Sequence, residues 1–236
     1  MINSRKLGRY MAVGLLMMTG AAQATLINRG GGMIYDSAQN LTWLQDANAG
    51  AGSSFDNGGS TTDGRMTWDN ATAWAASLTV GGLSGWRLPT VTDTGTLGCN
   101  FSYNGTDCGY NVDTAGSELA TMWYDILGNK AYYDTSGTGP QTGWGLTSTS
   151  ADGVTINNLQ SFVYWSGTEY APRTGLAWYF NTYNGYQGGH YKYYEVYAWA
   201  VRSGDVAGVP EPATVLLMTL GLAGLGLAKR GRRQRR

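Results

Sequence analysis

The sequence has few of the residues on which hydrolytic and metal chemistry depend. Its 236 residues include two cysteines and a single histidine, His190. Zinc sites use four ligands, and a catalytic triad needs a histidine beside a nucleophile. No Gly-x-Ser-x-Gly motif and no repeat of metal ligands accompanies His190. We therefore expect neither an enzyme nor a zinc protein, although a pair of carboxylates acting as a glycosidase remains an open alternative.

Positive charge is scarce outside the two ends of the chain. The whole sequence is balanced, with 16 basic and 16 acidic residues, but residues 25–208 contain seven basic against fifteen acidic residues, a net charge of −8. Binding to a polyanion needs clustered Lys and Arg side chains. We therefore expect no nucleic acid among the partners.

The N-terminal segment has the three parts of a secretory signal peptide. Basic residues come first, an apolar run from Met11 to Gly20 follows, and an Ala-Gln-Ala triplet at 22–24 matches a cleavage site. Residues 1–24 are therefore expected to be a signal peptide that the Sec translocon recognises. Oxidising conditions outside the cytoplasm then favour a disulfide between Cys99 and Cys108, which stabilises by about 2 to 3 kcal/mol.

The C-terminal end combines an uncharged run with a basic tail. Residues 213–228 carry no charge, and six of the last eight residues are Lys or Arg. As a helix, the run would be about 24 Å long, which is short for a hydrocarbon core of about 30 Å. The basic tail would stay on the cytoplasmic side and place residues 25–208 outside.

The residues Val209, Pro210, Glu211 and Pro212 precede this run. Together, the motif, the apolar run and the basic tail resemble the PEP-CTERM sorting signal of Gram-negative bacteria. The resemblance implies that residues 209–236 form a sorting signal with a transmembrane helix and that an exosortase is the partner. It also implies cleavage near Pro210, Glu211 and Pro212, a transient stay in the inner membrane, and delivery to the cell envelope or exopolysaccharide matrix.

Residues 25–208 have the length of one domain, and no internal repeat is visible. Strands are expected at Met33–Asp36, at Leu41–Leu44, and in three late segments at 162–168, 176–183 and 191–202. Two helices are expected, one capped by Thr67 and one at Ser117–Leu127. The first helix should bury Trp68, Ala71, Ala75 and Leu78 on one face. This order predicts an α+β domain with a mainly antiparallel sheet.

Three motifs occur in order along residues 33–203. They are Tyr35-Asp36 with Leu41-Thr42-Trp43, then Gly85-Trp86-Arg87-Leu88-Pro89-Thr90, then Tyr164-Trp165-Ser166 with Ala177-Trp178 and Val201-Arg202. This pattern resembles the Lcl C-terminal domain, long catalogued as a domain of unknown function. The resemblance implies a C-type-lectin-like fold, and similar domains occur in adhesins that bind sulfated glycosaminoglycans. The low positive charge argues against such a ligand here.

Two details of the domain bear on its chemistry. We expect Arg87 to be structural, with Glu118 as a bidentate partner that joins the Arg-Leu-Pro-Thr segment to the second helix.

No cofactor and no metal site is expected. Calcium is the one ion that the loop composition allows, because Asp46, Asp56 and Asp63 lie in a Gly-rich loop, but their spacing does not match an EF-hand.

Aromatic residues are the most abundant binding chemistry in the domain. Residues 164–199 contain nine Tyr and three Trp. Exposed rings can stack on sugars, and their polar edges can hydrogen-bond hydroxyl groups. The candidates for an exposed binding set are Tyr183, Tyr186, His190, Tyr191 and Tyr193. The sequence thus favours a non-catalytic module that binds a polysaccharide or surface glycan. The alternative is a structural matrix protein that acts through protein contacts, and a hydrolase is the third hypothesis.

Overall fold

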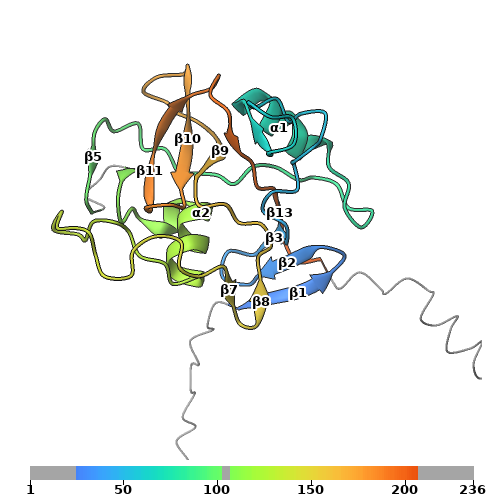
Figure 1. Ribbon diagram of the computed structural model, residues 1–236, viewed down its shortest axis with the longest axis horizontal. Helices are drawn as coiled ribbons and strands as arrows, with labels where there is room; N and C mark the ends of the chain where they lie inside the picture. The colour runs from blue at the N-terminus through green and yellow to red at the C-terminus, as the bar shows by residue number, and fades with distance from the viewer. Residues whose placement is uncertain (1–24, 103–106, 207–236) are drawn as a thin grey trace, which may run out of the picture.

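A computed structural model describes residues 25–102 and 107–206 (Figure 1). The signal peptide expected at 1–24 and the sorting signal expected at 209–236, with its transmembrane helix, lie outside these residues. Within the described part, no helix is long and apolar enough to cross a membrane. The described part is an α+β arrangement of mostly antiparallel sheets with short helices, as the sequence predicted.

A four-stranded antiparallel sheet joins the two ends of the domain. Its strands, in order, are β1 (Leu26–Gly30), β2 (Met33–Asp36), β3 (Leu41–Leu44) and β13 (Val201–Ser203). The strands expected at Met33–Asp36 and Leu41–Leu44 are confirmed with their bounds, and they pair as an antiparallel hairpin. The Asp36 carboxylate accepts the N–H groups of Ala38 and Gln39 and thereby orders the turn. An ion pair between Arg29 and Asp205 holds the two ends of the domain together. Beside this sheet lies the short hairpin of β7 (Ser150–Ala151) and β8 (Val154–Thr155).

A seven-stranded mixed sheet forms the rest of the fold. Its order is β4 (Arg65–Met66), β12 (Val196–Tyr197), β9 (Val163–Glu169), β10 (Leu176–Asn181), β11 (Tyr186–Tyr191), β6 (Cys108–Gly109) and β5 (Cys99–Asn100). The pairs β12–β9 and β5–β6 are parallel, and the other pairs are antiparallel.

The late strands differ from the prediction in two places. The segment 191–202, expected to be one strand, contains a turn in which the N–H of Tyr194 donates to the carbonyl of Tyr191 at 3.0 Å. The Gly-rich stretch before it, which was not among the expected strands, is the strand β11. Glycine weakens a strand in isolation, but here the lack of side chains lets neighbouring rings lie across the sheet.

The helices lie where the sequence placed them but differ in geometry. Helix α1 (Trp68–Ser77) starts after Thr67, whose side chain makes no capping hydrogen bond. It buries Ala71, Trp74 and Ala75. Trp68 and Leu78, also expected on the core face, are half-buried and pack against the core, and Leu78 follows the end of the helix.

The second helical region begins with one α-helical turn and continues as a π-helix. The 3₁₀ turn η1 (Thr114–Gly116) precedes it, and the two parts are α2 (Glu118–Ala120) and η2 (Thr121–Ile126). The Ser117 hydroxyl accepts the N–H of Ala120 and caps the start. Gly128, at φ +69°, follows the end of the helix. The prediction of two helices therefore missed the 3₁₀ turn and the π geometry.

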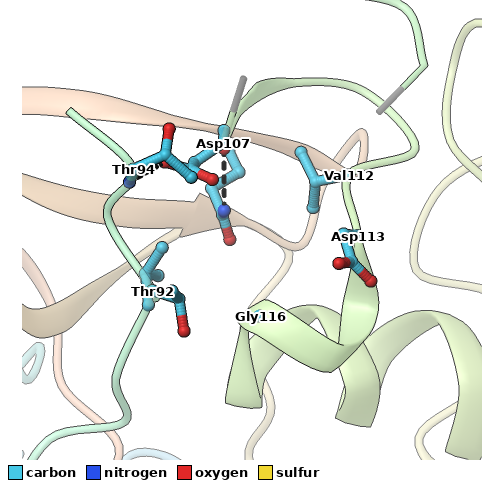
Figure 2. Close-up of a pocket in the computed structure, with 8 residues that line it drawn as sticks. Thr92, Thr94, Asp107, Val112, Asp113 and Gly116 are labelled. Atoms are coloured by element: carbon cyan, nitrogen blue, oxygen red, sulfur yellow. Dashed lines mark hydrogen bonds between the residues drawn. The ribbon is translucent and has the colours of Figure 1, made fainter. Parts of the chain in front are cut away.

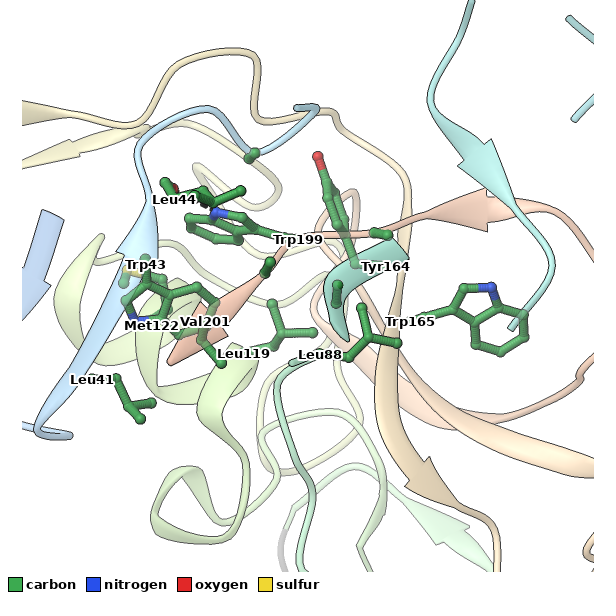
Figure 3. Close-up of a cluster of buried hydrophobic side chains, with 14 of the residues drawn as sticks. Leu41, Trp43, Leu44, Leu88, Leu119, Met122, Tyr164, Trp165, Trp199 and Val201 are labelled. Atoms are coloured by element: carbon green, nitrogen blue, oxygen red, sulfur yellow. Dashed lines mark hydrogen bonds between the residues drawn. The ribbon is translucent and has the colours of Figure 1, made fainter. Parts of the chain in front are cut away.

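The core is unusually rich in tryptophan, and Figure 3 shows its central part. Trp43 of β3 and Trp199 pack with ring centroids 4.4 Å apart, and both are fully buried. The Trp199 indole N–H donates to the carbonyl of Leu44 at 2.7 Å, which satisfies its polar atom. Because Trp199 lies just before β13, this packing joins the four-stranded sheet to the strands of the larger sheet.

Arg87 ties this core to the second helix. Its backbone exchanges two hydrogen bonds of 2.8 Å with Val201, and its two terminal nitrogens donate to the two carboxylate oxygens of Glu118, each at 2.7 Å. One of these oxygens also accepts the N–H of Thr90 at 2.7 Å. The structure thus places Arg87 and Glu118 in the bidentate pair expected for a structural role.

Candidate functional site

The five ligand-binding residues expected from the sequence all lie on one connected series of aromatic contacts. Tyr183, Tyr191 and Tyr193 are exposed, whereas Tyr186 and His190 are half-buried, so the expectation of full exposure is wrong for these two. Of the five, only Tyr191 and Tyr193 have rings in direct contact, at a centroid distance of 5.3 Å. Other aromatic residues connect the rest.

The exposed end of the series is a stack of four rings in the turn after β11. The His190 ring lies 4.1 Å from that of Tyr194, which lies 5.0 Å from that of Tyr193, and Tyr191 follows. Neighbouring planes differ by only 20° to 29°. We name His190, Tyr194, Tyr193 and Tyr191 the aromatic stack. Rings that already hold one another in place lose less rotamer freedom when a ligand binds.

The middle of the series lies on the large sheet. The rings of His190 and Tyr179 are 5.8 Å apart, those of Tyr179 and Tyr186 are 6.1 Å apart, and those of Tyr186 and Tyr110 are 5.1 Å apart. Gly188 pairs with Tyr179 across β10 and β11. A Cβ atom at Gly188 would lie 2.8 Å from Cε1 of Tyr186. The lack of a side chain at Gly188 therefore leaves room for the Tyr186 ring at this position.

The far half of the series consists of loop residues. Ring centroids are 5.1 Å apart for Tyr110 and Tyr133, 4.7 Å for Tyr133 and Tyr132, 4.7 Å for Tyr132 and Trp144, and 5.2 Å for Trp144 and Tyr183. None of these side chains is buried. The whole series, named here the aromatic band, consists of Tyr191, Tyr193, Tyr194, His190, Tyr179, Tyr186, Tyr110, Phe101, Tyr133, Tyr132, Trp144 and Tyr183.

Side-chain amides fix the loops that carry the far half of the band. Asn111 donates to the carbonyls of Phe101 at 2.7 Å and of Tyr133 at 3.0 Å. Gln141 donates to the carbonyls of Ala131 and Tyr133, each at 2.9 Å. Asn111 thus joins the segments of Phe101 and Tyr133, and Gln141 fixes the segment of Tyr132 and Tyr133, so these rings sit on an ordered backbone outside helices and strands.

The disulfide expected between Cys99 and Cys108 is present and supports the same surface. It joins the neighbouring strands β5 and β6. The sulfur of Cys108 lies 3.4 Å from the hydroxyl of Tyr186. The segment between Thr90 and Glu118 thus contributes Phe101 and Tyr110 to the band, and the cysteine pair in the same segment supports them.

The middle of the band is uncharged at neutral pH. Burial lowers the pKa of His190 below its usual value of 6.5 and raises the pKa of the phenols of Tyr179, Tyr186 and Tyr110. The imidazole is therefore neutral, and the phenols keep their protons. Neutral hydroxyl groups can both donate and accept hydrogen bonds, which suits a ligand made of neutral hydroxyl groups.

A small cleft between β11 and the second helical region is shown in Figure 2. Asp107 and Asp113 both line it, but Asp107 accepts the N–H of Thr94 and Asp113 accepts that of Ala115. Gln187 donates to the carbonyl of Asp107 at 2.9 Å. The cavity of about 50 Å³ has room for a few water molecules and not for a sugar ring. This cleft therefore gives no support to a hydrolase.

The aspartates of the Gly-rich loop have separate protein partners. Asp46 accepts hydrogen bonds from Asn48 and Asn158, Asp56 from Gly52 and Gly64, and Asp63 from Arg65. Among the described residues, no group of three or more His, Cys, Asp or Glu side chains is placed to hold a metal ion. The three carboxylates that suggested calcium thus do not gather around one point.

Several residues of the band escaped the sequence-based expectation. Tyr194 neighbours the expected set, and its adjacency to Tyr193 was a usable signal. Four other members come from segments that are distant in sequence from residues 183–193, namely Tyr110, Tyr132, Tyr133 and Trp144. Only the adjacent pair of tyrosines in "AYYD" hinted at them.

Two family models match the chain. The model described as Lcl C-terminal domain matches residues 32–202, and the model described as PEP-CTERM protein-sorting motif matches residues 208–233. No curated protein and no solved structure matches the chain.

Proposed function

The chain belongs to the Lcl C-terminal domain family, and we propose that its domain is a non-catalytic module that binds a neutral polysaccharide or surface glycan through the aromatic band. The observation that carries this proposal is the unbroken series of half-buried and exposed rings from Tyr191 to Tyr183. Pyranose rings have apolar faces that pack on aromatic side chains, and their hydroxyl groups find partners at the polar edges.

The C-terminal motif sets the destination of the protein. The PEP-CTERM signal at 208–233 is recognised by an exosortase and implies export to the cell envelope or matrix. As part of the same proposal, the Sec translocon exports the chain, residues 1–24 are cleaved off as a signal peptide, and residues 209–236 anchor the chain transiently in the inner membrane of a Gram-negative bacterium. Exosortase then cleaves near Pro210-Glu211-Pro212 and leaves the domain 25–208.

Charge supports a neutral rather than a sulfated ligand. Four of the seven basic residues at 25–208 form ion pairs with carboxylates, namely Arg29, Arg65, Arg87 and Lys192. Each such pair has little net charge and therefore attracts an anionic ligand only weakly. With a net charge of −8 over residues 25–208, the domain repels sulfated chains at long range.

The arrangement of the domain suits display of the band. The described chain begins and ends in the four-stranded sheet, where Arg29 and Asp205 pair. Figure 1 shows this sheet at one end of the molecule and β5 and β11 at the other. A domain held through its C-terminal side would therefore present the band away from its point of attachment. The likeness to C-type lectins is part of this proposal and fits the placement of binding residues on loops.

A glycan array with the exported protein tests the proposal, once in calcium and once in EDTA. We expect binding to one class of neutral glycan that does not depend on calcium. A variant with both Tyr191→Ala and Tyr193→Ala should lose this signal and remain folded by circular dichroism. Absence of glycan binding, together with band-dependent self-association or protein capture, would instead support the structural matrix alternative.

A further inference from the structure

A second, separate surface of the domain has the features of a sugar-binding site. An open depression of about 310 Å³ lies at the edge of the large sheet formed by β4, β12 and the start of β9. Its lining consists of Asp63, Arg65, Gln160, Ser161, Phe162 and Tyr197. The volume is at the lower end of the range for small-molecule sites and is large enough for one sugar ring.

Two rings at right angles form the apolar part of the depression. Phe162 is 45% exposed, and its ring meets that of Tyr197 at a centroid distance of 6.0 Å and an angle of 89°. The backbone of Phe162 is fixed, because its N–H donates to the Thr182 hydroxyl at 3.0 Å and its carbonyl accepts from the same hydroxyl at 2.8 Å. An exposed phenylalanine on a fixed backbone offers a positioned apolar face on which a sugar ring can pack.

The polar part of the depression is an oriented ion pair. Asp63 accepts from the N–H, Nε and Nη2 of Arg65 at 3.0, 2.9 and 2.6 Å. Burial alone would raise the pKa of Asp63, but the hydrogen bonds and charge of Arg65 lower the pKa overall. Asp63 is therefore an ionised acceptor next to a fixed guanidinium donor. Paired acceptors and donors of this kind fit neighbouring hydroxyl groups of one sugar.

Further hydrogen-bonding groups remain free in the depression. Among the described residues, the hydroxyls of Ser161 and Tyr197 have no hydrogen-bond partner, and Ser161 is exposed. The charges of Asp63 and Arg65 offset one another, and Glu195 adds negative potential at Arg65. This negative potential would repel a ligand with a carboxylate or sulfate, whereas it would not repel an uncharged sugar ring.

We propose that this depression binds a single uncharged hexose unit, with Phe162 as the stacking platform and Asp63, Arg65 and Ser161 as hydrogen-bonding partners. It lies on the β4–β12–β9 side of the sheet, whereas the aromatic band lies on β10 and β11 and on the loops beyond them. The rings of Phe162 and Tyr197 contact no ring of the band. The two sites can therefore be occupied at the same time and fail independently.

Amide NMR of the exported protein tests the depression without reference to the band. The probes are the methyl glycosides of glucose, galactose and mannose, each added to about 50 mM, because one ring with few contacts binds in the millimolar range. We expect at least one probe to shift the amides of Gln160, Ser161, Phe162 and Tyr197. Phe162→Ala should weaken this binding about tenfold or more, and Tyr193→Ala should leave it unchanged.

A second variant guards against a folding defect in Phe162→Ala. Ser161→Trp keeps the phenylalanine and fills the exposed side of the depression, so it should abolish the shifts while the melting temperature stays near that of the wild type. The proposal is overturned if none of the three probes shifts these amides, or if Ser161→Trp and Phe162→Ala bind as the wild type does. If Tyr193→Ala loses polysaccharide binding but keeps the amide shifts with the methyl hexosides, the band and the depression are separate sites, as proposed.

Discussion

Replacing Tyr193 with Ala tests the exposed end of the aromatic band with little disturbance to the fold. The side chain is 66% exposed, and among the described residues its ring contacts those of Tyr191 and Tyr194, at 5.3 and 5.0 Å. Both neighbours are themselves on the surface. We therefore expect the melting temperature to change by no more than about 2 °C, as for other surface substitutions.

The expected effect on binding follows from the area that a sugar covers. A hexose lying on the free part of the Tyr193 ring removes about 60 Å² of apolar surface from water, at about 25 cal/mol per Å². That amount corresponds to about a tenfold increase in Kd when the ring is removed. The stack already restrains the ring, so little of this gain is lost to ordering the side chain.

The assay is isothermal titration calorimetry with the glycan that gives the strongest signal on the array. Tyr35→Ala is the matched control, because Tyr35 lies on β2 of the four-stranded sheet and outside the band. The control should bind as the wild type does. A loss of less than about twofold for Tyr193→Ala, or an equal loss for the control, would refute the assignment of the stack as a contact surface.

Three further predictions address the supporting structure. Gly188→Ala places a methyl group 2.8 Å from Cε1 of Tyr186, so the ring must move. Glycan affinity should fall about fivefold, and the circular dichroism spectrum should stay unchanged. Unchanged affinity would show that the ligand does not touch Tyr186. Arg87→Ala removes both hydrogen bonds to Glu118. For a partly exposed pair, the free energy of unfolding should fall by about 2 kcal/mol, which lowers the melting temperature in calorimetry by about 4 to 8 °C. An unchanged melting temperature would exclude a structural role. NMR titration of His190 should give a pKa below 6.5, because burial disfavours the imidazolium. Below that pH the unfolded chain binds a proton that the folded chain does not, so the free energy of unfolding should be constant above about pH 6.5 and should fall as the pH decreases below it; a pKa at or above 6.5 would contradict this reasoning.

Local signals made much of the fold predictable. The hairpin of β2 and β3 forms where a four-residue polar turn separates two apolar runs, and Asp36 itself supplies the turn hydrogen bonds. Helix α1 and the second helical region also lie where periodicity and glycine stops placed them. The π geometry of η2 was not predictable, because π-helices are rare and the apolar spacing of this segment is that of an ordinary α-helix.

The candidate site was predictable only in part, because it is assembled from distant segments. Alternation along the late strands correctly drew attention to Tyr183, Tyr191 and Tyr193. It could not show that Tyr110, between Thr90 and Glu118, lies 5.1 Å from Tyr186, since that contact depends on how β6 pairs with β11. Most of the strand β11 was missed, because its glycines have low β-propensity and a packing role that only the neighbouring rings reveal.

Mapping a bound glycan onto the domain tests the central claim most directly. A crystal structure or NMR contact map of the exported protein with its best array ligand should place consecutive sugar rings along the aromatic band, with the aromatic stack at one end and Tyr183 toward the other. A ligand bound elsewhere, with the rings of the band untouched, would contradict the account.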